Sequence, residues 1–265
     1  MPIPPSRTGG TTPAVPPRRA AAPATPQEAV PRPDGPDPSM TPLALVRATA
    51  DVLPLLDSVT LAPYEQHRAA RLPAGERRED YLAAHALVRV CAARLLGVPP
   101  AGLTLGQVCA GCGGEDHGRP YLRDHPGVGV SLSHARGAVA AAAGPGPVGV
   151  DVEDASAAVF DARVAARSLA PAELAAVRAA PDPARSFLRL WVRKEALVKV
   201  GVTTLGRLRA VDLTDPGAPA GWRFADWSSP DGRLTAAAVA RTTPAVDGGN
   251  DPDSSRSAYP GEQHA

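Results

Sequence analysis

Hydrophobic positions repeat with two different periods along the middle of the chain. Some stretches carry apolar residues every three or four positions, as amphipathic helices do, and others alternate or run continuously apolar, as strands do. Helices are predicted at residues 62–72, 77–96, 171–180 and 184–200, and strands at 128–132, 138–143, 147–153 and 234–240. Clusters of Gly, Pro and Asp predict loops at 99–102, 111–120, 144–147 and 215–221. This mixture indicates an α+β fold.

Two terminal segments lack the large apolar residues that a core requires. Residues 1–39 contain 12 of the 31 prolines, and residues 243–265 consist mainly of Gly, Asp, Ser and Pro. Such compositions cannot bury enough surface to offset the entropy of ordering, so both tails are predicted to be disordered. The folded part is therefore expected between residues 40 and 242.

An internal repeat is visible within this folded part. Leu61-Ala-Pro-Tyr-Glu65 recurs as Leu169-Ala-Pro-Ala-Glu173, and Ala86-Leu-Val-Arg-Val90 recurs as Ala196-Leu-Val-Lys-Val200. Chance similarity in an Ala-, Leu- and Val-rich chain is one interpretation. The other is a pair of similar α+β halves, residues 40–143 and 144–242, related by a pseudo-twofold axis with a cleft between them. The second copy then carries the charges that the first copy lacks.

Charge and composition exclude several classes of protein. The 265 residues carry 28 basic and 27 acidic side chains, a net charge of +1, which argues against a dedicated nucleic-acid or membrane binder. No apolar run approaches the ~20 residues that span a bilayer, and the first residues do not resemble a signal peptide. Three cysteines in a chain of this length argue against a disulfide scaffold and favour a reducing cytoplasm.

The strand Val148-Gly-Val-Asp-Val-Glu153 carries two acidic residues on one face. Alternation places its valines on one side and Gly149, Asp151 and Glu153 on the other. The two carboxylates would lie about 7 Å apart, which suits a hard cation such as Mg²⁺. A solvated outer face is the alternative, although Gly149 would let another group approach closely.

The predicted helix at residues 184–200 carries charges that continue an aromatic stripe. Phe187, Trp191, Glu195 and Lys199 share one face at helical spacing, and Lys194 lies beside them. A surface Glu–Lys pair is one interpretation. However, 26 of the 28 basic residues are arginine, so the two lysines indicate a requirement for a compact ammonium, as at a phosphate.

Two further motifs have open interpretations. Ser133 and His134 end a predicted strand, where they would contact phosphate or simply occupy a turn; no acidic partner at fixed spacing favours a hydrolase triad. Cys109, Cys112 and His117 resemble half of a zinc site, to which Cys91 could add a fourth ligand. The alternative for this loop is ordinary packing.

Together these motifs resemble the 4′-phosphopantetheinyl transferases of the surfactin-synthetase type, particularly their actinobacterial members. Gly149-Val-Asp-Val-Glu153 is similar to the family's Gly-x-Asp-x-Glu, and Trp191-Val-Arg-Lys-Glu-Ala-Leu-Val-Lys199 matches Trp-x-x-Lys-Glu-x-x-x-Lys. Ser133-His134 resembles its Ser-His strand end, and Gly118-Arg-Pro120 its Gly-Lys-Pro. The resemblance covers about residues 45–240.

The resemblance implies that the chain moves the phosphopantetheine arm of coenzyme A onto a serine of acyl, polyketide or peptidyl carrier proteins, with Mg²⁺ as cofactor. It places the metal at Asp151, Glu153 and Glu195, and catalysis at Glu195, Lys194 and Lys199. It assigns coenzyme A binding to Arg77, Arg78, Arg119, Ser133, His134 and Lys199. A cytoplasmic monomer is expected, with neither nucleic acid nor membrane as a partner. The alternatives are a non-catalytic coenzyme A or carrier-binding relative and a zinc-dependent interaction module.

Overall fold

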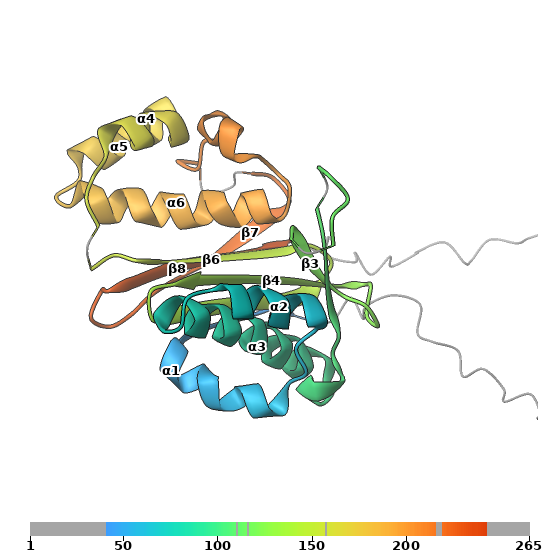
Figure 1. The fold of residues 1–265 in the computed structure, drawn as a ribbon. Coiled ribbons are helices and arrows are strands. Elements are labelled where there is room, and N and C mark those ends of the chain that lie inside the picture. Colours follow the sequence, from blue (N-terminus) through green and yellow to red (C-terminus); the bar gives the residue numbers. More distant parts are fainter. Residues whose placement is uncertain (1–40, 110, 116, 157, 216–218, 243–265) are drawn as a thin grey trace, which may run out of the picture. The chain divides into compact units, whose positions relative to one another are not determined.

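The computed structural model describes residues 41–109, 111–115, 117–156, 158–215 and 219–242. The tails that the sequence predicts to be disordered, residues 1–39 and 243–265, lie outside the described residues. Within the described ranges the chain forms two antiparallel sheets with helices on their outer faces (Figure 1). None of the helices in these ranges is long and apolar enough to span a membrane.

The first half holds a five-stranded sheet in the order β1-β5-β4-β3-β2. Its elements are β1 (Leu43–Ala48), α1 (Thr49–Val52), the 3₁₀ helix η1 (Leu53–Ser58), α2 (Pro63–Arg71), α3 (Glu76–Leu96), η2 (Pro100–Gly102), β2 (Leu105–Val108), β3 (Arg119–Leu122), β4 (Val128–Ala135) and β5 (Ala138–Pro145). The long helix α3 packs on one face of this sheet through alanines, Leu87 and Cys91.

The second half holds a three-stranded sheet in the order β6-β8-β7. Its elements are β6 (Val148–Asp154), α4 (Ala162–Ser168), α5 (Pro171–Ala179), α6 (Pro183–Lys199), η3 (Leu205–Ala210), β7 (Trp222–Ser228) and β8 (Leu234–Arg241). Helix α6 packs on this sheet, with its Ala196 and Leu197 in one apolar cluster with Val239 of β8.

The two halves repeat one connectivity, as the sequence repeat predicts. In each half the first strand pairs with the last strand, and the last strand pairs with the one before it, giving β1-β5-β4 and β6-β8-β7. Along the chain, α2 and α3 lie between β1 and the β4–β5 pair in the first half. Likewise, α5 and α6 lie between β6 and the β7–β8 pair in the second half. The β2–β3 hairpin is an addition to the first half. The α+β prediction is confirmed, although β5 runs to Pro145, beyond the predicted boundary after residue 143.

The repeated Leu-Ala-Pro-x-Glu motif starts α2 and α5 in the same way. Glu65 and Glu173 are both fully buried, and each accepts a hydrogen bond from the backbone N–H three residues earlier, at 2.5 and 2.7 Å. A buried carboxylate needs a cationic partner, and the long helix of each half supplies one. Arg89 and His85 of α3 contact Glu65, and Lys194 of α6 contacts Glu173.

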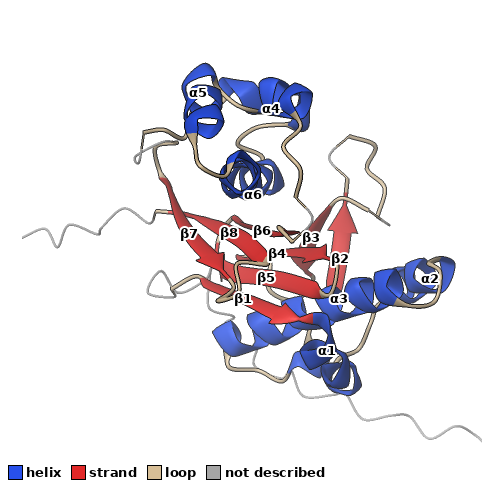
Figure 2. Cartoon of the chain, turned by 90° about the vertical axis from the view of Figure 1, so that its left-hand side faces the viewer, coloured by secondary structure: helices blue, strands red, loops and turns tan. Residues whose placement is uncertain are grey.

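The elements stack in four layers, with α3 and α6 outside and the two sheets between them (Figures 1 and 2). Between the sheets lie small side chains: Ala140 and Ala142 of β5 meet Val148, Val150 and Val152 of β6. Alanines on β5 let the sheets approach closely, which is how a chain with 4% aromatic residues fills its core. The valine face predicted for β6 is therefore the face between the sheets, and Asp151 faces α6.

The predicted helices and strands agree with the structure to within one residue for the four helices and three residues for the four strands. The strands β1, β2, β3 and β7 were not predicted. Strands β2 and β3 have four residues each and contain Gly106 and Pro120, which usually break strand patterns. Strand β7 is mostly exposed, so it lacks a clear apolar alternation.

Candidate active site

Asp151 lies at the centre of the candidate site, on β6 where the two halves meet. Its side chain is buried, and its Oδ1 accepts hydrogen bonds from Ser133 Oγ of β4 at 2.7 Å and from Lys199 Nζ of α6 at 2.8 Å. Its Oδ2 is buried without a hydrogen-bond partner among the described residues. An unpaired carboxylate oxygen in a buried position costs free energy, so this atom points to a ligand.

Two more carboxylates lie beside Asp151. Glu153 follows it on the same face of β6 and accepts a hydrogen bond from Trp191 Nε1 at 3.1 Å. Burial raises the pKa of Glu153, and the negative charges of Asp151 and Glu195 raise it further. Burial also raises the pKa of Glu195 on α6, again with Asp151 contributing. The like-charge effects on these pKa values place the three carboxylates in one neighbourhood.

The three carboxylates fit a divalent cation by their chemistry. They offer only oxygen ligands, the type that Mg²⁺ prefers, and one of these oxygens is the unpaired Oδ2 of Asp151. In this structure the three carboxylates are not drawn together around one point, because their oxygens do not all lie within 4.8 Å of one another. Among the described residues, only the ligand atoms of Cys109, Cys112 and His117 lie that close together. At Asp151 the ammonium of Lys199 balances the negative charge instead.

Lys199 connects both halves at the base of a cleft. Besides Asp151, its Nζ donates to the carbonyl of Val150 at 2.7 Å and, more weakly, to that of Leu132 at 3.4 Å. Its side chain remains 27% exposed. Two short hydrogen bonds hold the ammonium in position. The long contact with Leu132 leaves the third donor as the one that a ligand could take, which suits the predicted contact with phosphate.

The cleft beside Lys199 has a volume of about 480 Å³. It is lined by both halves: Gln107, Val108, Gly118, Arg119, Pro120, Val130, Ser131 and Leu132 from the first, and Val198 and Lys199 from the second. A neighbouring cavity of about 220 Å³ shares Arg119 and Lys199 and continues toward the Gly146–Pro147 connection. Two of the cations predicted to contact coenzyme A, Arg119 and Lys199, thus line both cavities.

Ser133 and His134 take different positions although they are adjacent in sequence. Ser133 faces β6 and donates to Asp151. His134 points to the other face of β4, the face that α3 covers. Desolvation lowers the pKa of His134, and the charges of His85 and Lys199 act in the same direction. Ser133 therefore positions the carboxylate, whereas His134 lies at the strand end on the face toward α3 and makes no hydrogen bond with Asp151 in the described part of the chain.

Lys194 is not in the cleft, which corrects the prediction that it acts at the phosphates. Its side chain is fully buried, and its Nζ contacts Glu173 Oε2 at 2.7 Å and donates to the carbonyls of Leu208 and Val211 at 2.9 and 2.6 Å. Since an ammonium has three donors, none is left for a substrate. The sequence alone could not separate this lysine from Lys199, because the burial of Lys194 depends on the packing of η3.

The arginines predicted to bind coenzyme A near the start of α3 lie outside the two cavities around Lys199. Arg78 donates through Nε and Nη2 to the carbonyl of Leu72, so its guanidinium anchors the loop before α3. Arg77 is exposed. Neither side chain lines the opening that holds Arg119 and Lys199. The structure therefore gives no support for placing Arg77 and Arg78 at the ligand.

The approach that Gly149 permits is made by the protein itself. A Cβ at this position would lie 2.3 Å from the carbonyl oxygen of Ala196, so Gly149 lets α6 pack directly on β6. This contact brings Lys199 and Glu195 to Asp151. The close approach predicted at Gly149 is therefore made by α6. Ser131 was not identified from the sequence; its Oγ accepts from the N–H of Val150 at 3.1 Å. Its alternation with Ser133 was the available signal.

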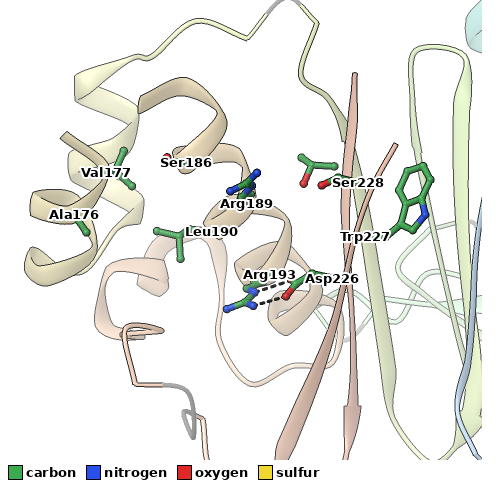
Figure 3. Close-up of a pocket in the computed structure, with 10 residues that line it drawn as sticks. Ala176, Val177, Ser186, Arg189, Leu190, Arg193, Asp226, Trp227 and Ser228 are labelled. Atoms are coloured by element: carbon green, nitrogen blue, oxygen red, sulfur yellow. Dashed lines mark hydrogen bonds and ion pairs between the residues drawn. The ribbon is translucent and has the colours of Figure 1, made fainter. Parts of the chain in front are cut away.

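A second cavity, of about 560 Å³, lies on the other side of α6 (Figure 3). Ser186, Arg189 and Arg193 line it, and Arg193 pairs with Asp226 of β7. At about 100° per residue, these positions lie on the face of α6 opposite Trp191, Glu195 and Lys199. The cavity therefore does not belong to the carboxylate site.

Part of the chain is similar to a known protein family. Residues 147–241 match the family model of the 4′-phosphopantetheinyl transferase superfamily. This range contains Asp151, Glu153, Glu195 and Lys199, together with β6, α6, β7 and β8.

A particular relative is the 4′-phosphopantetheinyl transferase of Bacillus subtilis, which is 29% identical over 115 residues. The aligned part covers 43% of this chain and 47% of the relative, so the chain spans about half the length of the curated relative that it matches.

Proposed function

We propose that the chain transfers the 4′-phosphopantetheine arm of coenzyme A to a serine hydroxyl of acyl, polyketide or peptidyl carrier proteins, with Mg²⁺ as cofactor. The observation that carries this proposal is the buried, unpaired Oδ2 of Asp151, beside Lys199 and inside the region that matches the superfamily model. In this reaction the serine oxygen forms a bond to the phosphorus that bears the pantetheine arm. The P–O bond to adenosine 3′,5′-bisphosphate breaks, and the serine proton passes to a base.

Asp151, Glu153 and Glu195 would hold the metal, which when bound would neutralise charge on the pyrophosphate. Lys199 and Arg119 supply positive charge from the two sides of the cleft. Such preset charges stabilise the charge that develops on the leaving phosphate without reorganisation during the reaction. Ser133 keeps Asp151 oriented by its hydrogen bond to Oδ1.

Glu195 is our candidate for the base that takes the serine proton. Its carboxylate lies in the same site as Asp151, where it can accept a proton. It lies on α6, one helical turn from Lys199. The base and the phosphate-binding ammonium are therefore held by the same rigid element.

The test is the intact mass of an apo carrier domain after incubation with the chain, coenzyme A and Mg²⁺. A gain of one phosphopantetheine group on the carrier serine is expected, with loss of the gain when that serine is replaced by alanine. Glu195→Gln should reduce the rate about 10²-fold or more. Arg189→Gln, on the opposite face of α6, is the matched control and should leave it unchanged. A carrier that keeps its apo mass while the chain still binds coenzyme A would support the non-catalytic relative instead.

A further inference from the structure

The loop between β2 and β3 brings three metal-binding side chains together. One ligand atom each from Cys109, Cys112 and His117 lies within 4.8 Å of the other two. Cys112 Sγ and His117 Nε2 are 3.3 Å apart. In a tetrahedral zinc site with Zn–S near 2.3 Å and Zn–N near 2.0–2.1 Å, the sulfur and nitrogen ligands are about 3.5 Å apart. The observed separation is that of a hydrogen bond between the two groups, and it is also close to the spacing that one zinc ion requires.

The backbone of this loop is arranged around the two sulfurs. Gly114 N–H donates to Cys112 Sγ at 3.4 Å, and backbone N–H groups of Cys112 and Gly111 interact with Cys109. The turn is closed by Gly113 N–H to the carbonyl of Cys109 at 2.8 Å, with Gly113 at φ +72°. Donors aimed at sulfur stabilise the thiolate form, which is the form that binds metals.

The loop is tied to the hairpin at both ends. Cys109 N–H donates to the carbonyl of Gly114 at 2.9 Å. At the other end Gly118 has φ +100°, and a Cβ there would lie 2.3 Å from the carbonyl oxygen of Val108. The chain therefore crosses directly over the end of β2 before it enters β3. His117 is thereby held beside the cysteines, although it lies five positions after Cys112.

We propose that Cys109, Cys112 and His117 bind one Zn²⁺ ion, with a water molecule as the fourth ligand. Two thiolates and an imidazole are softer ligands than Mg²⁺ accepts, and they suit zinc. Cys91 does not complete the site, because it lies on the buried face of α3, where its Sγ approaches the carbonyls of Leu43 and Ala141.

The proposed ion would stabilise one wall of the cleft. Val108, Gly118 and Arg119 line the cleft and directly flank the three ligands. A zinc ion that joins the two ends of the loop therefore restricts the backbone on both sides of the Val108–Gly118 crossing. This role is structural, and it does not depend on which reaction the cleft performs.

The test uses the full chain, purified with a reductant that does not bind metals. After chelation and removal of the chelator, Zn²⁺ is titrated against a chromophoric competitor, and bound metal is measured by elemental analysis. One Zn²⁺ per chain is expected, and Co²⁺ in its place should give thiolate-to-cobalt absorption and tetrahedral visible bands. Cys112→Ser and His117→Gln should each weaken zinc binding by at least about tenfold. His67→Gln, at an exposed position on α2, should leave it unchanged.

Substoichiometric zinc, or equal affinity in wild type and His117→Gln, would overturn the proposal. So would a Cys109–Cys112 disulfide that persists in reductant, because a redox pair would then explain the loop. If a variant fails to fold, the Co²⁺ spectrum of the wild-type chain still decides the question. A cobalt complex without thiolate bands would contradict the ligand set. None of these outcomes requires transferase activity, so failure here is distinguishable from failure of the proposed function.

Discussion

Replacing the two lysines of α6 should have different effects: the Lys194 variant should lose stability, and the Lys199 variant should lose turnover. Lys194→Met removes the buried partner of Glu173 and leaves the carbonyls of Leu208 and Val211 without their donor. Breaking a buried ion pair from one side costs about 3–5 kcal/mol. For a folded part of this size, 1 kcal/mol shifts the melting temperature by roughly 2–4 °C, so we expect a decrease of about 6–20 °C. Below that temperature the folded variant should retain its turnover.

Lys199→Met should behave differently, because this ammonium is 27% exposed and lies in the cleft. Its ion pair with Asp151 is partly open to solvent, so a smaller loss of stability than in Lys194→Met is expected, together with a loss of turnover of about 10²-fold or more. The double variant Glu173→Gln/Lys194→Met removes both charges of the buried pair and should be more stable than Lys194→Met alone.

Calorimetry and the carrier mass assay, run on the same preparations, give both quantities. A Lys194→Met variant that melts like the wild type but loses turnover would refute the structural role assigned to Lys194.

Three further predictions follow from single contacts. Desolvation would raise the pKa of Glu65, but hydrogen bonds from His85 and Arg89 outweigh it and lower this pKa below 4.5. The ionised carboxylate therefore stabilises the fold at pH values above its pKa in the unfolded chain. This stabilisation is lost as the pH falls through the lowered pKa of the folded state. Melting curves of Glu65→Gln should therefore lie below wild type at pH 7 and converge with it in acid; parallel curves would exclude this linkage. Gly149→Ala should lower the free energy of unfolding by about 1–3 kcal/mol, because the added Cβ pushes α6 away from β6. Gly206→Ala is the control: its Cβ would have no atom within 4 Å, so chemical denaturation should show no change in its stability. Arg119→Ala should raise the KM for coenzyme A by about tenfold with a smaller effect on kcat, and an unchanged KM would remove Arg119 from the ligand.

Periodicity predicted most of the framework because its longest elements are strongly patterned. Helical spacing placed Glu195 and Lys199 on one face of α6, and strand alternation placed Asp151 and Glu153 on one face of β6. The structure shows that these two faces meet. The repeat at Glu65 and Glu173 predicted the duplicated connectivity. Spacing within one helix or strand is a local property, and the repeat compares two such local patterns, so both can be found in the sequence.

Features that depend on long-range packing could not be predicted. The burial of Lys194 requires η3, which lies 11 residues or more further along the chain, and nothing near Lys194 distinguishes it from Lys199. The role of Gly149 depends on where α6 lands. The exposed strand β7 has little hydrophobic signal because its partners cover only part of it. Patterns identify candidates, but only the fold decides which charges face the cleft.

The measurement that most directly tests the account is the rate at which an apo carrier gains phosphopantetheine with Asp151→Asn compared with wild type. The substitution keeps the shape of the side chain and its contact with Ser133, but it removes the charge that Oδ2 offers to a cation. We predict a rate lower by about 10²-fold or more that added coenzyme A does not restore. A variant that remains folded and transfers the arm at the wild-type rate would contradict the carboxylate-centred site.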